Sequence, residues 1–172
     1  IVNVEQWMTH IAVMSLVDNR ETGLNTGYND DYYLYRGVND PRFILGYHDL
    51  DTILNEGDSG GSTTTSIFGA TANNGSGQAF GRFLHHPDFE PIYYATLQRL
   101  IDTVFAPANF NPLIDQTLGD YVPANVIARM KTWNASRVAY VRGAISGLVP
   151  VPLATAVLAG EPRSPTPLTV AT

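Results

Sequence analysis

The chain lacks cysteine, has one lysine and contains no long apolar run. Without cysteine among its 172 residues, it can form no disulfide, thiolate nucleophile or cysteine-based zinc site. No apolar run approaches the length of about 18 residues that a membrane-spanning helix needs. The net charge of -6 and pI near 5.0 argue against nucleic acid as a partner, because its phosphates repel an acidic surface.

Hydrophobic residues make up 44% of the chain, which suits one domain with a core of ordinary size. In the N-terminal segment Trp7, Ile11 and Met14 recur at helical spacing, and this pattern ends at Asp18. Further helices are predicted over 87–106, 112–118 and 124–145. The residues expected to face the core are Ile92, Leu97, Leu100, Ile101, Val104, Val126, Met130, Trp133, Val138 and Val141.

Two short aromatic-rich segments, 32–36 and 42–51, predict a β-hairpin with its turn at 37–41. In an extended strand, residues two apart point the same way, so Asp49 and Asp51 would reach one ion together. Mg²⁺ and Mn²⁺ prefer such carboxylate oxygens. The pattern therefore predicts a metal site where the second strand ends. The alternative is that both residues only form turns or cap a helix, since Asp favours these roles.

Acidic residues gather in the same region. Nine of the chain's 16 acids lie there, and they are Asp18, Glu21, Asp30, Asp31, Asp40, Asp49, Asp51, Glu56 and Asp58. Like charges at this density repel one another unless water or a cation separates them. The region is either a solvated face or a cation site, and the aromatic strands that run through it favour the cation.

A loop rich in Gly, Ser, Thr and Asn is predicted over 55–81. Its Asp-Ser-Gly-Gly sequence at 58–61 resembles a serine-protease motif, but no strand-rich barrel is predicted around it. His85 and His86 precede a predicted helix, where capping or packing is favoured over metal binding. From Pro150 onward no helical period remains, which predicts a domain over 1–148 and a linker entering a β-domain over 149–172.

Several motifs in this order are typical of one family. They are Asp18 after an apolar helix, Asn-Asp-Asp-Tyr-Tyr-Leu-Tyr-Arg-Gly at 29–37, Asp-Pro-Arg-Phe at 40–43, His-Asp-Leu-Asp-Thr-Ile-Leu at 48–54, Phe-Leu-His-His-Pro-Asp-Phe at 83–89 and Asn-Pro-Leu-Ile-Asp at 111–115. Over roughly residues 1 to 145, the chain resembles the C-terminal half of a CotH-type (spore-coat protein H-like) kinase domain.

The resemblance implies an α+β, mainly helical fold like the C-lobe of an atypical protein kinase, with the metal site on the hairpin. It implies transfer of phosphate from ATP to protein Ser/Thr with Mg²⁺ or Mn²⁺. Asp18 falls where the family has the carboxylate that orients the acceptor hydroxyl. Asp49 falls on the family's metal-binding Asp, and Asp51 is the second acid of that motif. Asp31 would hold the metal together with Asp49.

The chain departs from the family pattern around these residues. Asp30 and Asp31 stand where many relatives have two Asn, and Tyr47-His48 replaces Pro-Trp. The added negative charge could change the metal preference. The sequence has no Gly-rich loop that would cover phosphates, followed by a strand that carries a lysine. Its single lysine, Lys131, lies far downstream. We therefore expect a fragment that is inactive without an N-terminal lobe of the same chain, from a secreted or cell-envelope protein.

Two other functions are compatible with the same residues. A catalytically inactive relative could serve as a surface binding module, with Ca²⁺ on the same oxygens. It would not be an EF-hand, because Ile53 stands where a third ligand should follow Asp49 and Asp51. A glycan-acting enzyme could use Asp18 and Asp49 as its carboxylates, with sugars stacked on the tyrosines. Metal dependence separates this last function from the kinase.

Overall fold

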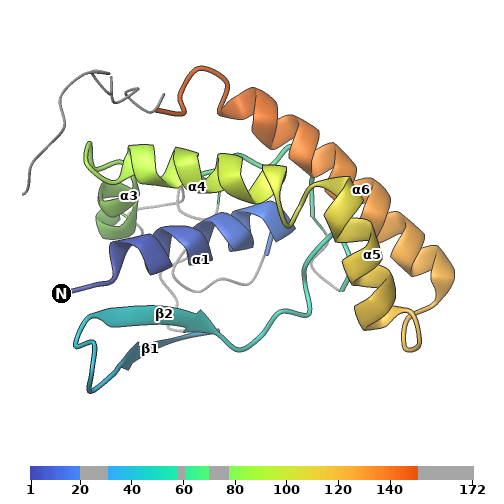
Figure 1. Cartoon of the computed structure of the whole chain (residues 1–172), viewed down its shortest axis with the longest axis horizontal. Coiled ribbons are helices and arrows are strands. Elements are labelled where there is room, and N and C mark those ends of the chain that lie inside the picture. The colour runs from blue at the N-terminus through green and yellow to red at the C-terminus, as the bar shows by residue number, and fades with distance from the viewer. Residues whose placement is uncertain (20–30, 58–60, 70–77, 151–172) are drawn as a thin grey trace, which may run out of the picture.

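A computed structural model describes residues 1–19, 31–57, 61–69 and 78–150. Its elements are α1 (Val4–Val17), β1 (Tyr32–Arg36), β2 (Phe43–Tyr47), α3 (Gln78–Leu84), α4 (Glu90–Asp102), α5 (Pro107–Leu118) and α6 (Ala124–Ala144) (Figure 1). The predicted class is confirmed, since the described part is α+β and mainly helical with a two-stranded antiparallel hairpin. None of its helices is long and apolar enough to cross a membrane.

Helix α1 is the central element of the fold and lies between the hairpin and α4 (Figure 1). It begins at Asn3, whose side-chain oxygen accepts a hydrogen bond from the Gln6 amide at 3.2 Å. Met8, Ile11 and Leu16 are buried, and the helix contacts α4, α6 and β2. A helix that buries most of its circumference belongs to the core. Core packing of α1 therefore also holds Asp18, the residue at its C-terminal end.

The two strands pair with Tyr32 opposite Tyr47 and Arg36 opposite Phe43. The prediction that the second strand continues to residue 51 is wrong, because β2 ends at Tyr47. Since β1 begins at Tyr32, no described residue of that strand lies opposite the sequence after Tyr47. Asp49 and Asp51 therefore belong to a loop, and the alternation of side chains along a strand does not apply to them.

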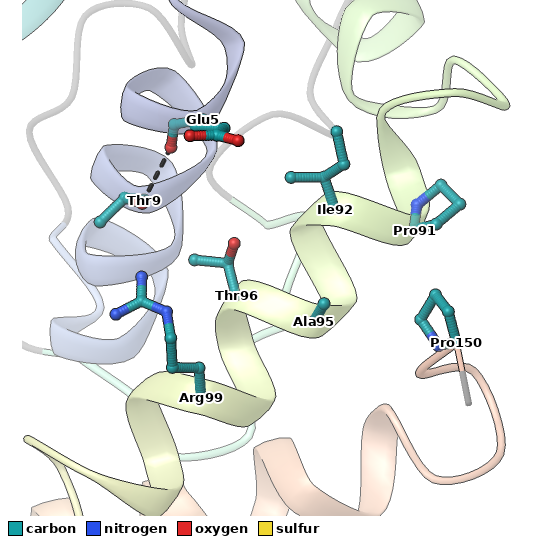
Figure 2. A pocket seen from close by; sticks show the side chains of 8 residues that line it. All are labelled: Glu5, Thr9, Pro91, Ile92, Ala95, Thr96, Arg99 and Pro150. Atoms are coloured by element: carbon teal, nitrogen blue, oxygen red, sulfur yellow. Dashed lines mark hydrogen bonds between the residues drawn. The ribbon is translucent and has the colours of Figure 1, made fainter. Parts of the chain in front are cut away.

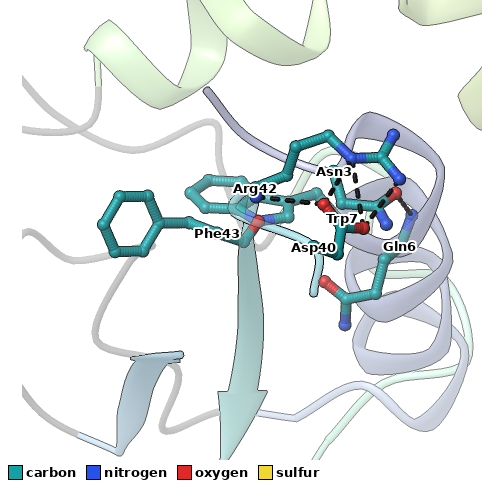
Figure 3. Close-up of polar contacts among 6 residues, drawn as sticks. All are labelled: Asn3, Gln6, Trp7, Asp40, Arg42 and Phe43. Carbon is teal, nitrogen blue, oxygen red and sulfur yellow. Dashed lines mark hydrogen bonds and ion pairs between the residues drawn. The ribbon is translucent and has the colours of Figure 1, made fainter. Parts of the chain in front are cut away.

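The hairpin is fastened to the first turns of α1 (Figure 3). The Trp7 indole N–H donates to the Phe43 carbonyl at 2.9 Å, and the Asn3 amide donates to the same oxygen at 3.0 Å. Gln6 exchanges two hydrogen bonds with the backbone of Leu45, at 2.8 and 2.9 Å. These bonds satisfy backbone groups on the edge of β2, so the position of the hairpin is set by α1.

The turn between the strands carries an exposed ion pair. The Arg42 guanidinium donates to both carboxylate oxygens of Asp40, and the Arg42 amide donates to Oδ1 as well (Figure 3). These hydrogen bonds lower the pKa of Asp40 to about 2. This acid is therefore already paired with a cation inside its own turn.

The later helices differ in detail from the prediction. Helix α4 begins at Glu90 instead of Pro87, and Val104 is 46% exposed whereas Tyr93 is fully buried. Helix α5 begins earlier than predicted, with Pro107 in its first turn, a position that tolerates proline because no amide hydrogen is needed there. Helix α6 ends one residue before the predicted Ile145.

The predicted loop over 55–81 is wrong at its C-terminal end, where α3 begins at Gln78. Residues 61–69 of that stretch consist of turns without a regular helix or strand. The motif residues 29–30, most of the 58–61 sequence and nearly all of the predicted linker over 149–172 lie outside the described residues.

The face of α6 that packs into the core contains two buried polar residues that the helical periodicity did not predict, Asn134 and Arg137.

Candidate functional site

Asp18 ends helix α1 in a left-handed backbone conformation, with φ 48° and ψ 51°. This conformation is rare for residues with a Cβ, although Asp and Asn adopt it more readily than most. The backbone N–H of Asp18 donates to the Ser15 carbonyl at 3.3 Å, which closes the last turn of the helix. Only 4% of Asp18 is exposed, so its carboxylate is placed in the interior by the helix end.

The Asp18 carboxylate accepts hydrogen bonds from the segment 61–69. The Ser62 amide donates to Oδ2 at 2.7 Å, and the Thr65 hydroxyl donates to the same oxygen at 3.1 Å. A Cβ added to Gly61 would lie 3.0 Å from this oxygen, so the backbone approaches it closely. Two such donors hold a buried carboxylate in one orientation.

Arg137 of α6 is the buried cation beside this group, with no exposed surface. Its guanidinium donates to the Ser15 carbonyl at 2.8 and 3.2 Å, to the Thr63 carbonyl at 3.1 Å and to the Thr65 carbonyl. Burial lowers the pKa of Arg137, and the negative charge of Asp18 opposes that shift. Arg137 thus joins the last turn of α1 to the segment that binds Asp18.

The far end of the same segment is fastened through Ile67. Its carbonyl accepts hydrogen bonds from the Tyr93 hydroxyl at 2.6 Å and from the Ser15 hydroxyl at 3.2 Å. Burial raises the pKa of Tyr93, whose hydroxyl therefore remains a donor at physiological pH. Residues 61–67 are a turn-rich segment that these hydrogen bonds hold against α1, α4 and α6, while Ser62, Thr64 and Ser66 stay exposed.

The other predicted site residues lie on the hairpin side of the molecule. Asp31 has a left-handed backbone, with φ 57°, immediately before β1, and it is half-buried. Asp49 is half-buried and Asp51 is exposed, both in the loop after β2. Among the described residues, no group of three or more His, Asp or Glu side chains could hold a metal ion.

The loop that carries Asp49 and Asp51 returns to the end of α1. The Leu54 amide donates to the Val17 carbonyl at 2.8 Å, directly before Asp18 in the chain. Tight turns follow, because Leu54 and Asn55 have φ values of 56° and 62°. Asn55 then accepts a hydrogen bond from the Gly61 amide at 2.9 Å. The acidic loop and the Asp18 carboxylate thus lie on segments that meet at one end of α1.

Several cavities border these elements in the described part of the chain. One of about 580 Å³ lies between α1 and α4, where Ile92, Thr96 and Arg99 face Glu5 and Thr9 (Figure 2). Neither Asp18 nor Asp49 is among its lining residues.

A second cavity, of about 460 Å³, borders the segment that binds Asp18. It is lined by Asn55 and Thr63 on that side and by residues 128–136 of α6 on the other, including Arg129 and Trp133. Arg129 also forms an ion pair with Glu56 at 2.8 Å. Thr63 of the segment that binds Asp18 lines this cavity, whereas no residue of that segment lines the larger one.

Of the two roles predicted for the histidine pair, packing is confirmed, since the ring centre of His85 lies 4.3 Å from that of Phe68 and the ring centre of His86 lies 4.7 Å from that of Phe89. Capping is not found, because α4 has no side-chain hydrogen bond at its N-cap. His86 Nδ1 accepts a hydrogen bond from the Asp88 amide at 3.2 Å, and His85 Nδ1 lies 3.3 Å from a carboxylate oxygen of Glu90. Lys131 is paired with Asp115 on the surface between α6 and α5. In the described part of the chain, no lysine therefore faces Asp18 or the acidic loop.

Sequence reasoning missed Arg137, because it lies on the core-facing side of α6, where only apolar residues were expected. Trp133, Arg137 and Val141 follow one another at a spacing of four residues, and all three are buried. A charged residue at such a position needs partners in the interior. That signal marks a buried cation, but it does not say which carbonyls the cation reaches.

Comparison with known protein families identifies the family of the chain. A family model described as CotH kinase protein matches residues 1–137, which is most of the 172-residue chain. The chain is therefore a kinase-related protein. It belongs to the CotH kinase family, which confirms the resemblance seen in the sequence. Comparison with curated proteins gave no match, and comparison with solved structures gave none either.

Proposed function

We propose that this protein takes part in the metal-dependent transfer of the γ-phosphate of ATP to Ser or Thr of a protein. The single observation that carries the proposal is the state of Asp18, at the family's hydroxyl-orienting position. Its carboxylate is buried, and Oδ2 is held by the Ser62 amide and the Thr65 hydroxyl. A group that orients a reacting hydroxyl needs such a fixed position, since phosphoryl transfer depends on positioning and charge stabilisation.

The carboxylates of the acidic loop suit a divalent metal in their chemistry. Asp49 would hold the ion together with Asp31 or Asp51, because hard cations prefer carboxylate oxygen. Mg²⁺ sites often use one or two protein carboxylates and complete the shell with water and phosphate oxygens. The proposal therefore needs no group of three protein ligands. When bound there, the metal would neutralise charge on the phosphates of ATP.

The protein's own residues would supply orientation. Asp18 would accept a hydrogen bond from the acceptor hydroxyl and hold its oxygen in line with the γ-phosphate. The turns at Leu54 and Asn55 would keep the acidic loop against the end of α1, so that both carboxylate sites serve one reaction. Lys131 would not supply the cationic group that contacts the phosphates in other kinases, since it is paired with Asp115.

The first experiment is transfer of labelled γ-phosphate from ATP by the complete gene product with Mg²⁺ or Mn²⁺. Autophosphorylation and a casein-like acceptor are measured for the wild type, for Asp49→Asn and for Asp120→Asn. Asp120 is an exposed acid between α5 and α6, which makes it a matched control for the loss of one surface charge. We expect labelling that requires metal, that Asp49→Asn abolishes, and that Asp120→Asn leaves unchanged.

The melting temperature of Asp49→Asn should equal or exceed that of the wild type, because the change removes one charge from a crowded acidic region. A large loss of stability would instead assign Asp49 a structural role. If the wild type labels nothing but still binds Mn²⁺ or Ca²⁺, the protein is a catalytically inactive binding module. If sugar hydrolysis without metal is found, the glycan-acting alternative replaces the kinase.

A further inference from the structure

We infer that Arg137 is a positioning residue, which holds Asp18 and the segment 61–67 in the geometry that phosphoryl transfer requires. This inference rests on the proposed function, in which Asp18 orients the acceptor hydroxyl. The proposed function gives Arg137 no role, and Arg137 lies on α6, far along the chain from Asp18. Its role follows from the set of atoms that its guanidinium reaches.

The guanidinium bridges two backbone segments that are distant in sequence. On one side, it donates to the Ser15 carbonyl at 2.8 Å and to the Ser15 hydroxyl at 3.3 Å. On the other side, it donates to the carbonyls of Thr63, at 3.1 Å, and of Thr65. The planar fork of an arginine can reach several acceptors at once, which a lysine cannot do.

The last turn of α1 and the segment 61–67 both contact Asp18. The Ser15 carbonyl that Arg137 binds also accepts the backbone N–H of Asp18, so the guanidinium contacts the turn from which this side chain projects. Thr63 and Thr65 belong to the segment whose Ser62 amide and Thr65 hydroxyl bind Oδ2. Arg137 thus holds the helix turn from which the Asp18 side chain projects. It also holds the backbone of the segment that donates hydrogen bonds to the Asp18 carboxylate.

The environment of Arg137 shows that this arrangement is built into the core. The residue has no exposed surface, and its guanidinium carbon lies 5.3 Å from the centre of the Tyr140 ring. Its hydrogen bonds go to carbonyl and hydroxyl oxygens, while the nearby charge that favours the cation is that of Asp18. A buried charge is costly without partners, so displacing the segment 61–65 would leave Arg137 poorly satisfied.

The role differs from general packing in a way that can be measured. If Arg137 only filled space in the core, a folded variant would keep its catalytic rate constant. If it positions Asp18, a folded variant loses rate after substrate has bound. The Michaelis constant for ATP should then stay the same, because the proposed metal ligands, Asp49 with Asp31 or Asp51, include neither Asp18 nor Arg137.

The test compares Arg137→Lys with the wild type and with Arg142→Lys. Arg142 lies on the same helix, is exposed and pairs with Asp102 at 2.8 Å, so its replacement controls for the chemical change. For Arg137→Lys, we expect kcat to fall about 10-fold to 100-fold, the range that small misplacements of reacting groups produce. The KM for ATP should change less than about twofold, and Arg142→Lys should match the wild type. Arg137→Met should lose more activity than Arg137→Lys, if it folds.

Hydrogen exchange of the Ser62 amide gives a readout that does not depend on activity. This amide should exchange faster in Arg137→Lys than in the wild type, while amides in the middle of α4 keep their protection. Unchanged kcat in Arg137→Lys, or an unchanged Ser62 amide, would overturn the positioning role. If the wild type transfers no phosphate, the proposed function fails, and the Ser62 amide alone then decides whether Arg137 holds this segment.

Discussion

Replacement of Asp18 separates its structural contribution from its proposed chemical role. Asp18→Ala removes the acceptor for the Ser62 amide and the Thr65 hydroxyl. The hydroxyl can rotate to another acceptor, but a partly buried amide that loses its partner costs about 1–2 kcal/mol. Alanine is also disfavoured at φ 48°, which adds about 1 kcal/mol. We expect Asp18→Ala to lower the free energy of unfolding by about 2–3 kcal/mol.

Asp18→Asn should be milder, because asparagine keeps one oxygen acceptor and adopts the left-handed conformation readily. Hydrogen bonds to a charged acceptor contribute more than neutral ones, by roughly 1 kcal/mol each. Part of this difference will be recovered by small movements of the donors, so we expect a loss of about 1–2 kcal/mol. The free energy of unfolding of a domain of this size is usually about 5–15 kcal/mol, so this variant should fold.

The assay is urea denaturation followed by tryptophan fluorescence, since the two tryptophans lie in α1 and α6, on both sides of the site. Asp120→Ala serves as the control, and a change within about 0.5 kcal/mol is expected for such an exposed residue. An Asp18→Ala variant as stable as this control would refute the structural argument. A folded Asp18→Asn variant with full phosphoryl transfer would refute the chemical one.

The remaining predictions concern pH and backbone strain. Burial lowers the pKa of His10 from its ordinary value near 6.5 to about 4. The unfolded chain therefore binds more protons between these values, so stability is complete above pH 6.5 and falls as pH drops toward 4. After allowance for the part of the ring that water reaches, His10→Phe should remove about 1–2 kcal/mol of this pH dependence, measured by denaturation at pH 7 and pH 4.5. Gly57→Ala should destabilise by more than about 2 kcal/mol, because φ is +85° and the new Cβ would lie 2.1 Å from the Asp51 carbonyl oxygen. Gly147→Ala, at φ +77° with no atom within 4 Å, should cost only about 1 kcal/mol.

Each of these predictions has a clear contrary result. His10 stacks on Tyr47 with 4.2 Å between ring centres, and phenylalanine keeps this contact while losing the titration. An unchanged acid sensitivity in His10→Phe would show that the effect comes from groups other than His10. Equal losses for the two glycine variants would show that contact with the Asp51 carbonyl is relieved by local movement of the loop.

Much of the fold could be predicted from local patterns. The aromatic segments around a turn gave the hairpin, because alternation and turn chemistry act over a few residues. The helical periodicity gave α1 and nearly all of α6 for the same reason. The motifs in order gave the family, which the match over residues 1–137 confirms. The end of the second strand was misplaced, because a strand ends where its partner ends, and the partner's start at Tyr32 is a matter of pairing.

The candidate site divides in the same way. The sequence by itself determined that Asp18 ends a helix and that Asp49 and Asp51 lie near the end of a hairpin strand, since the signals for these features are local. Only the tertiary structure decided that Asp18 is buried against residues 62–65 and that Arg137 lies beside it. The bonds from Arg137 to Ser15 span 122 positions of sequence. Contacts over such a separation arise when whole helices pack together, and no spacing within a single helix encodes them.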